Sequence, residues 1–329
     1  MFNLLEFARE LIDIDSTTGR EQDAGAWLAA ALRSLGYRVV EQPVANGRAN
    51  VLATLDDPVV TLSTHYDCVP PFFSSGVRDG KLYGRGSCDA KGILAAQVAA
   101  AERLRQSGER RVALLFVVGE ERGSDGAVAA NATPIGSKFL INGEPTDSRL
   151  GLATRGNLRV KLHAAGRACH SAAPEHGESA IDKLIDALVY LRTLELPAEP
   201  TLGRTYYTIG LIEGGVAPNV VSPHAWAEVM FRTIGSPDEV LRAVSPLESV
   251  VRIEEVLRVP IVRLHTVDGF DAAVFPFTTD IPLLDNWGKP MLYGPGSFLV
   301  AHTSEEHVTL DELNGAVDAY VRLAQLCLS

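Results

Sequence analysis

Residues 111–121 read RVALLFVVGEE, an uninterrupted apolar run that ends in a glycine and two glutamates. A continuous apolar run of this length is typical of a strand that is buried on both faces of a sheet. Two adjacent carboxylates directly after such a strand repel each other and lose hydration, which is costly without a cation. The segment therefore predicts a buried strand followed either by a cation-binding acid pair or by a solvated loop.

Helical and strand patterns alternate on both sides of this run. The spacing of apolar residues predicts helices over 4–14, 21–35 and 90–105, and short strands over 37–40, 50–55, 59–64 and 138–142. The same pattern returns after residue 262, with a strand at 291–293 and a closing helix over 310–326. Strands that alternate with helices predict an α/β fold with a central sheet flanked by helices on both faces.

The middle of the chain has a different order of elements. Strands at 158–165, 205–212, 224–232 and 250–256 enclose helices at 180–194 and from 237 onward. This strand–helix–strand–strand–helix–strand order predicts a ferredoxin-like α+β domain with one open sheet face. We therefore expect an inserted domain at 156–264 and a second, discontinuous domain formed by 1–155 and 265–329; the alternative is one continuous domain.

The bulk composition restricts the class of protein. At 329 residues the chain is long enough for two domains, and its 46% hydrophobic and 22% charged residues are ordinary for a globular protein. A formal net charge of −11 disfavours nucleic acids and anionic membrane surfaces as partners. The first residues, MFNLLEFARELIDIDS, lack the basic start and unbroken apolar stretch of a secretory signal, and no run is long enough to span a bilayer. We expect a cytoplasmic protein.

The cysteines do not form a recognisable pattern. Cys68, Cys88, Cys169 and Cys327 show no Cys-x-x-Cys spacing. A disulfide framework belongs to secreted proteins, and nothing in the sequence marks this chain as secreted. We interpret all of them as free thiols.

Two motifs in the first part of the chain carry candidate metal ligands. STHYD at 63–67 ends an apolar strand, so that His65 could bind a metal while Asp67 orients the imidazole. LYGRGSCDAKG at 82–92 holds Asp89 in a tight turn before an alanine-rich helix. Taken alone, the first motif is more often an incidental surface pair, and Asp89 is better interpreted as a helix N-cap.

Further candidates follow the later strands. Glu120 and Glu121 follow the run at 111–118, Glu144 lies in NGEPT at 142–146, and His302 follows GPG at 294–296. The segment HTSEEH at 302–307 matches neither His-Glu-x-x-His nor His-x-x-Glu-His, so we do not interpret it as a self-contained metal site. Histidines and carboxylates at successive strand ends form a ligand set that suits a pair of divalent zinc ions.

These motifs, in this order, resemble those of a known family over essentially the whole chain. The family is the dizinc hydrolases that include acetylornithine deacetylase, succinyl-diaminopimelate desuccinylase, aminoacylase and glutamate carboxypeptidase. His-x-Asp, Gly-Arg-Gly-x-x-Asp-x-Lys-Gly, Glu-Glu, Gly-Glu-Pro-Thr and Gly-Pro-Gly with Ala-His-Thr all match. The resemblance implies a zinc-peptidase-like catalytic domain carrying an inserted lid and dimerisation domain.

The resemblance also implies roles for the matching residues. Asp89 would bridge two Zn²⁺ ions, or Co²⁺ or Mn²⁺ as substitutes. The other metal ligands would be His65 and Glu144 for one ion, and Glu121 and His302 for the other. Glu120 would be the general base and Asp67 would brace His65. The peptide bond between Asp89 and Ala90 would be cis.

The lid segments match the family as well. GRACHSA at 166–172 implies that His170 reaches the active site of the other subunit of a homodimer and donates to the developing oxyanion. GGVAPNVV at 214–221 and Phe231–Arg232 imply that Asn219 and Arg232 hold the α-carboxylate of the substrate. Gly296 is also expected among the substrate-binding residues.

The resemblance is closest to acetylornithine deacetylases and implies hydrolysis of an N-acyl amino acid, with acetate as a product, in arginine biosynthesis. Alternatives are a lysine-pathway hydrolase acting on a carrier-bound substrate, a dipeptidase or carboxypeptidase of the same family, and a catalytically inactive binding relative. The segment 70–80 is shorter than usual, and Ser222-Pro223 replaces the commoner Pro-Asp. Both departures concern the region where the substrate would bind, so they leave the substrate open.

Overall fold

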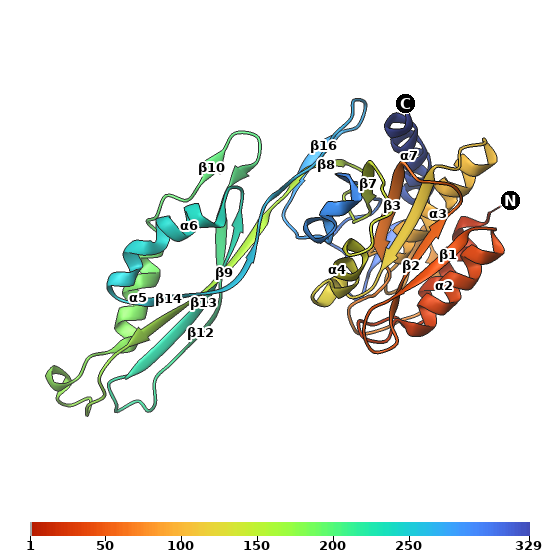
Figure 1. The fold of residues 1–329 in the computed structure, drawn as a ribbon. Coiled ribbons are helices and arrows are strands. Elements are labelled where there is room, and N and C mark those ends of the chain that lie inside the picture. Colours follow the sequence, from red (N-terminus) through yellow and green to blue (C-terminus); the bar gives the residue numbers. More distant parts are fainter. Residues whose placement is uncertain (1) are drawn as a thin grey trace. The chain divides into compact units, whose positions relative to one another are not determined.

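The computed structural model describes residues 2–329, which form two compact units (Figure 1). The first unit holds the residues up to Leu152 together with Leu264–Ala273 and Thr279–Ser329, and the second holds Ala153–Arg263 and Val274–Thr278. The segment 274–278 therefore belongs to the second unit, although the sequence pattern predicted it in the first domain.

A mixed six-stranded sheet forms the centre of the first unit. Its spatial order is β1 (Arg38–Pro43), β2 (Ala49–Thr54), β6 (Val112–Val117), β3 (Val60–His65), β7 (Phe139–Asn142) and β17 (Lys289–Leu292). Strands β6, β3, β7 and β17 are mutually parallel. Strand β2 runs antiparallel to β6, and the edge strand β1 runs antiparallel to β2. The carboxyl ends of the four parallel strands therefore lie at the same edge of the sheet, where open α/β sheets place their sites.

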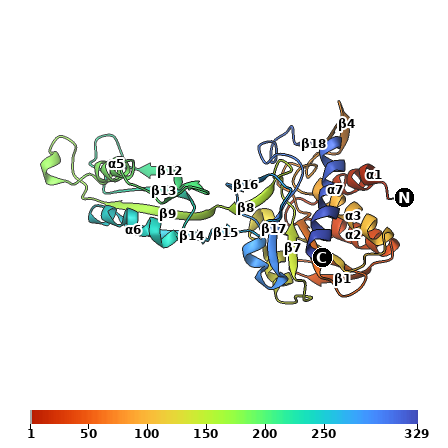
Figure 2. The same ribbon diagram turned by 90° about the horizontal axis from the view of Figure 1, so that it is seen from above.

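Helices cover both faces of this sheet. One face packs in a large apolar core with α1 (Leu4–Ile12), α2 (Gln22–Ser34), α3 (Lys91–Gln106) and α7 (Leu310–Leu328). Helix α4 (Asp125–Asn131) and the buried Trp287 cover the other face. Helices α3 and α7 lie side by side (Figure 2). Helix α7 begins at a capping box between Thr309 and Glu312, which fixes its start.

A small antiparallel sheet connects distant parts of the first unit. It consists of β4 (Gly76–Arg78), β5 (Lys81–Tyr83) and β18 (His307–Thr309), with β5 in the middle. Strand β18 pairs with β5 through Val308 and Leu82. Because of this pairing, the residues just before β18 lie beside the turn that follows β5. These short strands and helix α4 were not predicted, because each has too few residues to show a period.

The second unit has the predicted ferredoxin-like architecture. Its sheet is antiparallel in the order β12 (Tyr206–Gly214), β13 (His224–Thr233), β9 (Gly156–Ala165) and β14 (Arg252–Val259). Helices α5 (Ala180–Leu191) and α6 (Pro237–Val244) pack on one face of this sheet in a separate apolar core. Serine side chains cap both helices, Ser179 for α5 and Ser236 for α6.

A few short elements complete the fold. Strands β10 (Ala198–Glu199) and β11 (Gly203–Arg204) form a hairpin, and β8 (Leu150–Thr154) lies between β15 (Val262–Arg263) and β16 (Ala272–Phe275). Within residues 2–329, no helix combines the length and apolar character needed to cross a membrane. The expected α/β catalytic domain and antiparallel α+β domain are both confirmed.

Candidate metal centre

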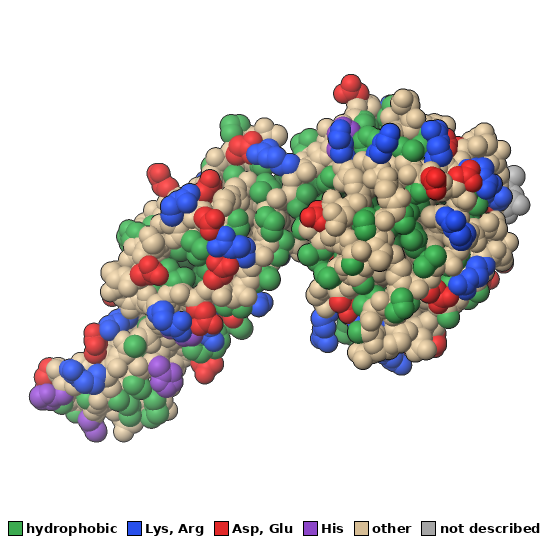
Figure 3. Space-filling view, viewed as in Figure 1, with side chains coloured by type: hydrophobic (Ala, Val, Ile, Leu, Met, Phe, Trp, Pro, Cys, Tyr) green, Lys and Arg blue, Asp and Glu red, His purple; other side chains and the backbone are tan. Residues whose placement is uncertain are grey.

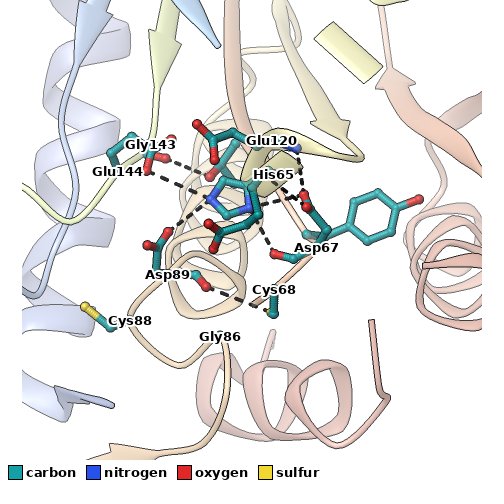
Figure 4. A network of polar contacts seen from close by, with 12 residues as sticks. His65, Asp67, Cys68, Gly86, Cys88, Asp89, Glu120, Gly143 and Glu144 are labelled. Carbon is teal, nitrogen blue, oxygen red and sulfur yellow. Dashed lines mark hydrogen bonds and ion pairs between the residues drawn. The ribbon is translucent and has the colours of Figure 1, made fainter. Parts of the chain in front are cut away.

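His65 is the last residue of strand β3 and is almost fully buried, with 1% of its surface exposed. Its Nδ1 atom lies 3.0 Å from the backbone oxygen of Asp67 and 3.4 Å from the Asp67 carboxylate. With Nδ1 in these contacts, Nε2 is directed at the carboxylates of Asp89 and Glu144 (Figure 4). A ring nitrogen held in this way leaves the other nitrogen available as a metal ligand.

Asp89 lies between the two candidate histidines. Its Oδ1 is 3.0 Å from His65 Nε2, and its Oδ2 is 3.3 Å from His302 Nε2. Helix α3 begins after Asp89, and its N-cap residue Ala90 makes no side-chain cap, so Asp89 is not the N-cap of this helix. The Asp89–Ala90 peptide bond is cis, as the resemblance implied. One carboxylate thus presents each of its oxygens to a different histidine.

The acid pair occupies a short 3₁₀ turn, η1 (Glu120–Arg122), just after strand β6. The backbone N–H groups of Glu120 and Glu121 donate to the Asp67 carboxylate at 3.0 and 3.2 Å. Glu121 Oε1 lies 2.9 Å from His302 Nε2. Asp67 therefore contacts both the His65 imidazole and the turn that carries the two glutamates.

Glu144 follows strand β7 and is 5% exposed. Its Oε2 lies 3.9 Å from His65 Nε2, whereas its Oε1 is buried and has no hydrogen-bond partner among residues 2–329. The preceding residue, Gly143, is held by a backbone hydrogen bond to Ser63 at 2.7 Å and by the Thr64 hydroxyl at 2.7 Å. A buried carboxylate oxygen without a donor is costly unless a cation binds it.

The electrostatics of this cluster favour bound cations. Burial raises the pKa values of Glu120 and Glu144 well above the usual range, and neighbouring carboxylates add to the effect. Although burial opposes it, His302 and His65 hold the pKa of Asp89 below its usual value. Hydrogen bonds to Asp89 and Glu121 raise the pKa of His302 to about 10. Excess carboxylate without enough positive charge is the situation that a divalent cation relieves.

The donor set fits divalent metal ions. Ligand atoms of His65, Asp89 and Glu121 lie within 4.8 Å of one another, which is close enough for one ion or for two neighbouring ions bridged by Asp89. His302 contacts Asp89 and Glu121, and Glu144 faces His65, so the donors surround Asp89 on both sides. Imidazole nitrogens mixed with carboxylate oxygens suit Zn²⁺ and related transition metals.

Two buried acids near this cluster were missed in the sequence. Asp280 is 1% exposed, and burial raises its pKa to about 6; its charge also raises the pKa of Glu120 and Glu144. Glu306 is fully buried against the turn that carries Asp89. Neither follows a continuous apolar strand, as Glu120, Glu121 and Glu144 do, and neither lies in a glycine-rich turn before a helix, as Asp89 does. His307, also in the discounted segment 302–307, contacts Lys81 and Tyr83 instead.

The candidate substrate-binding residues are divided between the two units. Gly296 is buried with φ +77°, and a Cβ there would meet Cys88 Sγ at 2.6 Å, so it packs directly against the Asp89 turn. His170, Asn219 and Arg232 belong to the second unit. The exposed residues His170 and Asn219 lie on neighbouring segments, since Ser171 N donates to Asn219 O at 3.0 Å.

An open groove of about 520 Å³ lies beside these segments, within the second unit. Ser171, Pro218 and Val220 are among its lining residues. Arg232 lies on the open face of the sheet, in strand β13 opposite Tyr206. Among the described residues its guanidinium has no carboxylate partner. Arg232 thus offers a half-buried cationic group suited to an anionic ligand, whereas the groove itself is also lined by the acidic residues Glu178 and Asp182.

An α/β unit with histidines and acids gathered at the carboxyl ends of parallel strands, joined to a ferredoxin-like unit, defines a metal-dependent hydrolase. The model of Peptidase family M20/M25/M40 matches residues 61–326. A peptidase M20 domain-containing protein of Schizosaccharomyces pombe is 36% identical over 98% of this chain and 84% of its own length. A probable carboxypeptidase of Aspergillus terreus is 38% identical over 98% of this chain and 86% of its own length. The chain belongs to the M20/M25/M40 peptidase family and is a metallohydrolase.

Solved structures share the fold. Aminopeptidase PepT from Bacillus cereus superimposes with a TM-score of 0.83 at 20% identity, covering 99% of this chain and 98% of that one. The YXEP protein of Bacillus subtilis, described as a dinuclear metal binding peptidase, has a TM-score of 0.72 at 15% identity, covering 98% and 97%. These comparisons do not favour the expected closeness to acetylornithine deacetylase, because the two relatives named above are a peptidase M20 domain-containing protein and a probable carboxypeptidase.

Proposed function

We propose that this protein is a dizinc carboxypeptidase that releases the C-terminal amino acid from a short peptide. The observation that carries the proposal is the position of Asp89, whose two oxygens face two different histidines at 3.0 and 3.3 Å. One ion would be held by Asp89, His65 and Glu144, and the other by Asp89, His302 and Glu121. Co²⁺ or Mn²⁺ could replace zinc, because the same donors suit them.

Bound divalent cations supply an acidified water and a positive charge next to the scissile carbonyl. The chain itself supplies the proton transfer. Glu120 lies next to the candidate metal ligands (Figure 4). Burial raises the pKa of its carboxyl. A base of raised pKa can accept the proton of the attacking water and return it to the departing amine nitrogen. His170 would donate to the oxyanion that develops on the carbonyl oxygen.

The second unit would recognise the amino acid that leaves. Arg232 has no carboxylate partner among the described residues, so its planar guanidinium is available for the α-carboxylate of the substrate. Asn219 and Gly296 would add polar and backbone contacts. The same contacts would bind an N-acyl amino acid, because it also has a free α-carboxylate on the amino acid whose nitrogen forms the scissile amide. The two candidate reactions differ only in the acyl side of the bond.

A homodimer through the second unit is part of the proposal. Helix α5 exposes Ile185, Val189 and Tyr190, at 48, 55 and 45% of their surfaces, and strand β12 exposes Leu211 and Ile212. Strand β12 is also an edge strand of its sheet. Exposed apolar side chains next to an open strand edge are typical of a surface that is covered by a partner. On the face shown in Figure 3, hydrophobic side chains gather at one end of this unit.

A substrate panel tests the proposal. Purified protein with Zn²⁺ is given an N-blocked dipeptide, the same peptide as its C-terminal amide, an unblocked dipeptide and a series of N-acetyl amino acids that includes N-acetylornithine. The expected result is release of the C-terminal amino acid from the blocked dipeptide, no reaction with the amide, and loss of activity after chelation. Cleavage of the amide at the same rate would contradict carboxylate recognition and the carboxypeptidase proposal.

N-acyl-amino-acid deacylation is the second candidate function, since the shared carboxylate recognition favours it equally. A higher kcat/KM for N-acetyl amino acids than for blocked dipeptides would select it. A substrate presented on an acidic carrier protein fits less well with a net charge of −11. An inactive binding relative also fits less well, because the whole ligand set and Glu120 are retained.

A further inference from the structure

Glu306 is fully buried and contacts the turn that carries Asp89. Its Oε1 atom accepts the backbone N–H groups of Gly86, Cys88 and Asp89 at 2.9, 3.1 and 3.0 Å. Its Oε2 atom accepts the Arg85 guanidinium at 2.5 Å. Backbone amides that converge on one anion form a concave anion-binding site, and here the anion is a side chain of the same protein. All four donors come from residues 85–89.

Arg85 extends these contacts to the loop before β4. It is 2% exposed, its Nε donates to the Pro71 backbone oxygen at 3.2 Å, and its own backbone N–H donates to Phe73 O at 3.1 Å. A buried ion pair that also has hydrogen bonds to the backbone is held in one geometry, and loss of one partner leaves the other uncompensated. The Glu306 carboxylate is therefore fixed on both of its oxygens.

The turn has little room to take another conformation. Gly86 has φ +89°, and a Cβ there would lie 2.8 Å from Cys68 Sγ. A Cβ on Gly92 would lie 2.1 Å from the Ser87 backbone oxygen. The backbone amides that donate to Glu306 are therefore packed in one arrangement. This arrangement fixes the Asp89 backbone, which in turn limits where the Asp89 carboxylate can lie.

The segment 302–306 contacts Asp89 at two points. His302 Nε2 lies 3.3 Å from the Asp89 Oδ2 atom, and Glu306 accepts the Asp89 backbone N–H. His302 itself has a left-handed backbone with φ 64°, which is uncommon for a residue other than glycine and needs support from its surroundings. The segment 302–306 thus supplies one candidate ligand, His302, and also holds the backbone of Asp89, whose carboxylate lies between the two histidines.

We propose that Glu306 is a positioning residue for the metal pair: by accepting three backbone amides of the 86–89 turn it holds the Asp89 carboxylate between His65 and His302. The inference rests on the metal site of the proposed function. Among residues 2–329, the Glu306 side chain contacts the candidate ligands only through the backbone N–H of Asp89, so it would act on the metals through Asp89. Removing its charge should change metal affinity rather than substrate affinity.

Glu306→Gln tests this role. Glutamine has one acceptor oxygen and one NH₂ donor, so it cannot satisfy both the backbone amides and Arg85. Zn²⁺ affinity is measured by chelator competition on folded protein, and the Co²⁺ absorption spectrum reports the coordination geometry. We expect Zn²⁺ affinity to fall at least ~10-fold, as is usual when a group supporting a metal ligand is lost. The Co²⁺ spectrum should change, and at saturating metal kcat should fall more than KM rises.

Two matched glutamates are the controls. Glu102 is also buried and pairs with Arg105 in helix α3, at 2.9 and 2.6 Å, but it has no contact with the Asp89 turn among the described residues. Glu305 is the exposed neighbour and pairs with Arg78. Glu102→Gln should lower thermal stability with unchanged Zn²⁺ affinity, and Glu305→Gln should change neither. Glu306→Asp, which keeps the charge on a shorter side chain, should recover part of the lost affinity.

The outcomes separate the inference from the function on which it rests. If the wild type binds two ions and Glu306→Gln binds them with the same affinity and Co²⁺ spectrum, Glu306 is only a structural residue and the inference is wrong. If Glu306→Gln does not fold, Glu306→Asp is judged by the same two measurements, and wild-type values in it overturn the inference. If the wild type itself binds no metal pair, the proposed function fails and this inference fails with it.

Discussion

The Asp67 carboxylate accepts the backbone N–H of Glu120 at 3.0 Å, so the residue that contacts the His65 ring also holds the turn of the candidate base. Its second oxygen accepts the Glu121 N–H at 3.2 Å and the Thr18 hydroxyl at 2.8 Å. A carboxylate can accept all of these bonds because each oxygen has two lone pairs. Asp67 therefore connects strand β3 with the end of strand β6.

Asp67→Asn should reduce activity at least ~10-fold, the scale of effect seen when a group that supports metal ligands is changed. Asparagine has a single acceptor oxygen, so one of the two amides in the η1 turn loses its partner. Steady-state kinetics and Zn²⁺ competition check the result, with the exposed Asp57→Asn as control. Wild-type activity in Asp67→Asn would show that the contact has no functional role.

Glu120→Gln and Glu121→Gln should separate the base from the ligand. Glu120→Gln is expected to keep its metal content while turnover falls by at least the ~10²-fold that acid–base groups supply. Glu121→Gln is expected to lose metal, because Glu121 contacts His302 and belongs to the group that can hold an ion. Metal analysis after gel filtration measures both. The reverse pattern would mean that the two roles are exchanged.

Metal removal should lower thermal stability. Without cations, the carboxylates of Asp89, Glu121 and Glu144 share a buried site with too little positive charge. Ligands that bind only the folded state stabilise it, so a chelator should lower Tm and added Zn²⁺ should restore it. Asp89→Ala removes the residue between both histidines, and its Tm should not respond to either treatment. A chelator response that persists in Asp89→Ala would place the metals elsewhere.

Subunit mixing tests whether His170 acts on the site of its partner. Inactive His170→Ala and inactive Glu120→Ala proteins are mixed under conditions that exchange subunits. In a heterodimer one site has Glu120 from its own chain and His170 from the partner, so activity should return. Mixing Glu120→Ala with Asp89→Ala is the control, because both lesions lie in the first unit and no intact site can form. Heterodimers that remain inactive would rule out action across the dimer.

Glu109 provides a pH test outside the site. Contacts with Arg111 lower the pKa of Glu109 from 4.5 to about 2. A lowered pKa means that the folded state favours the charged form, so its contribution is complete above pH 4.5 and disappears as pH falls through about 2. The metal-free Glu109→Gln protein should therefore have a free energy of unfolding lower than that of metal-free wild type at pH 7, by less than ~1 kcal/mol for such an exposed pair, and a slightly lower Tm. This Tm difference should shrink in acid; a constant difference would contradict the pairing.

Periodicity and strand-end motifs predicted most of the architecture. The run before Glu120 is a fully buried central strand, and the ferredoxin-like order of elements at 156–264 is present in the second unit. These predictions hold because a strand buried on both faces must be apolar throughout, and a helix packed on one side must show its period. Helix α4 and strands β4, β5 and β18 were missed because they are too short to show either signal.

Sequence by itself determined which residue types are available as candidate metal ligands. His65, Asp89, Glu121, Glu144 and His302 stand at strand ends or in turns, and matching motifs named them before any distance was known. Which oxygen of Asp89 faces which histidine depends on packing between segments more than 200 residues apart, as in the contact from Glu306 to the Asp89 amide with a separation of 217. Only the tertiary structure decided that contact. The hydrogen bond from Asp89 to Glu306 forms because the β18–β5 pairing brings the two segments together, and no local sequence pattern encodes that pairing.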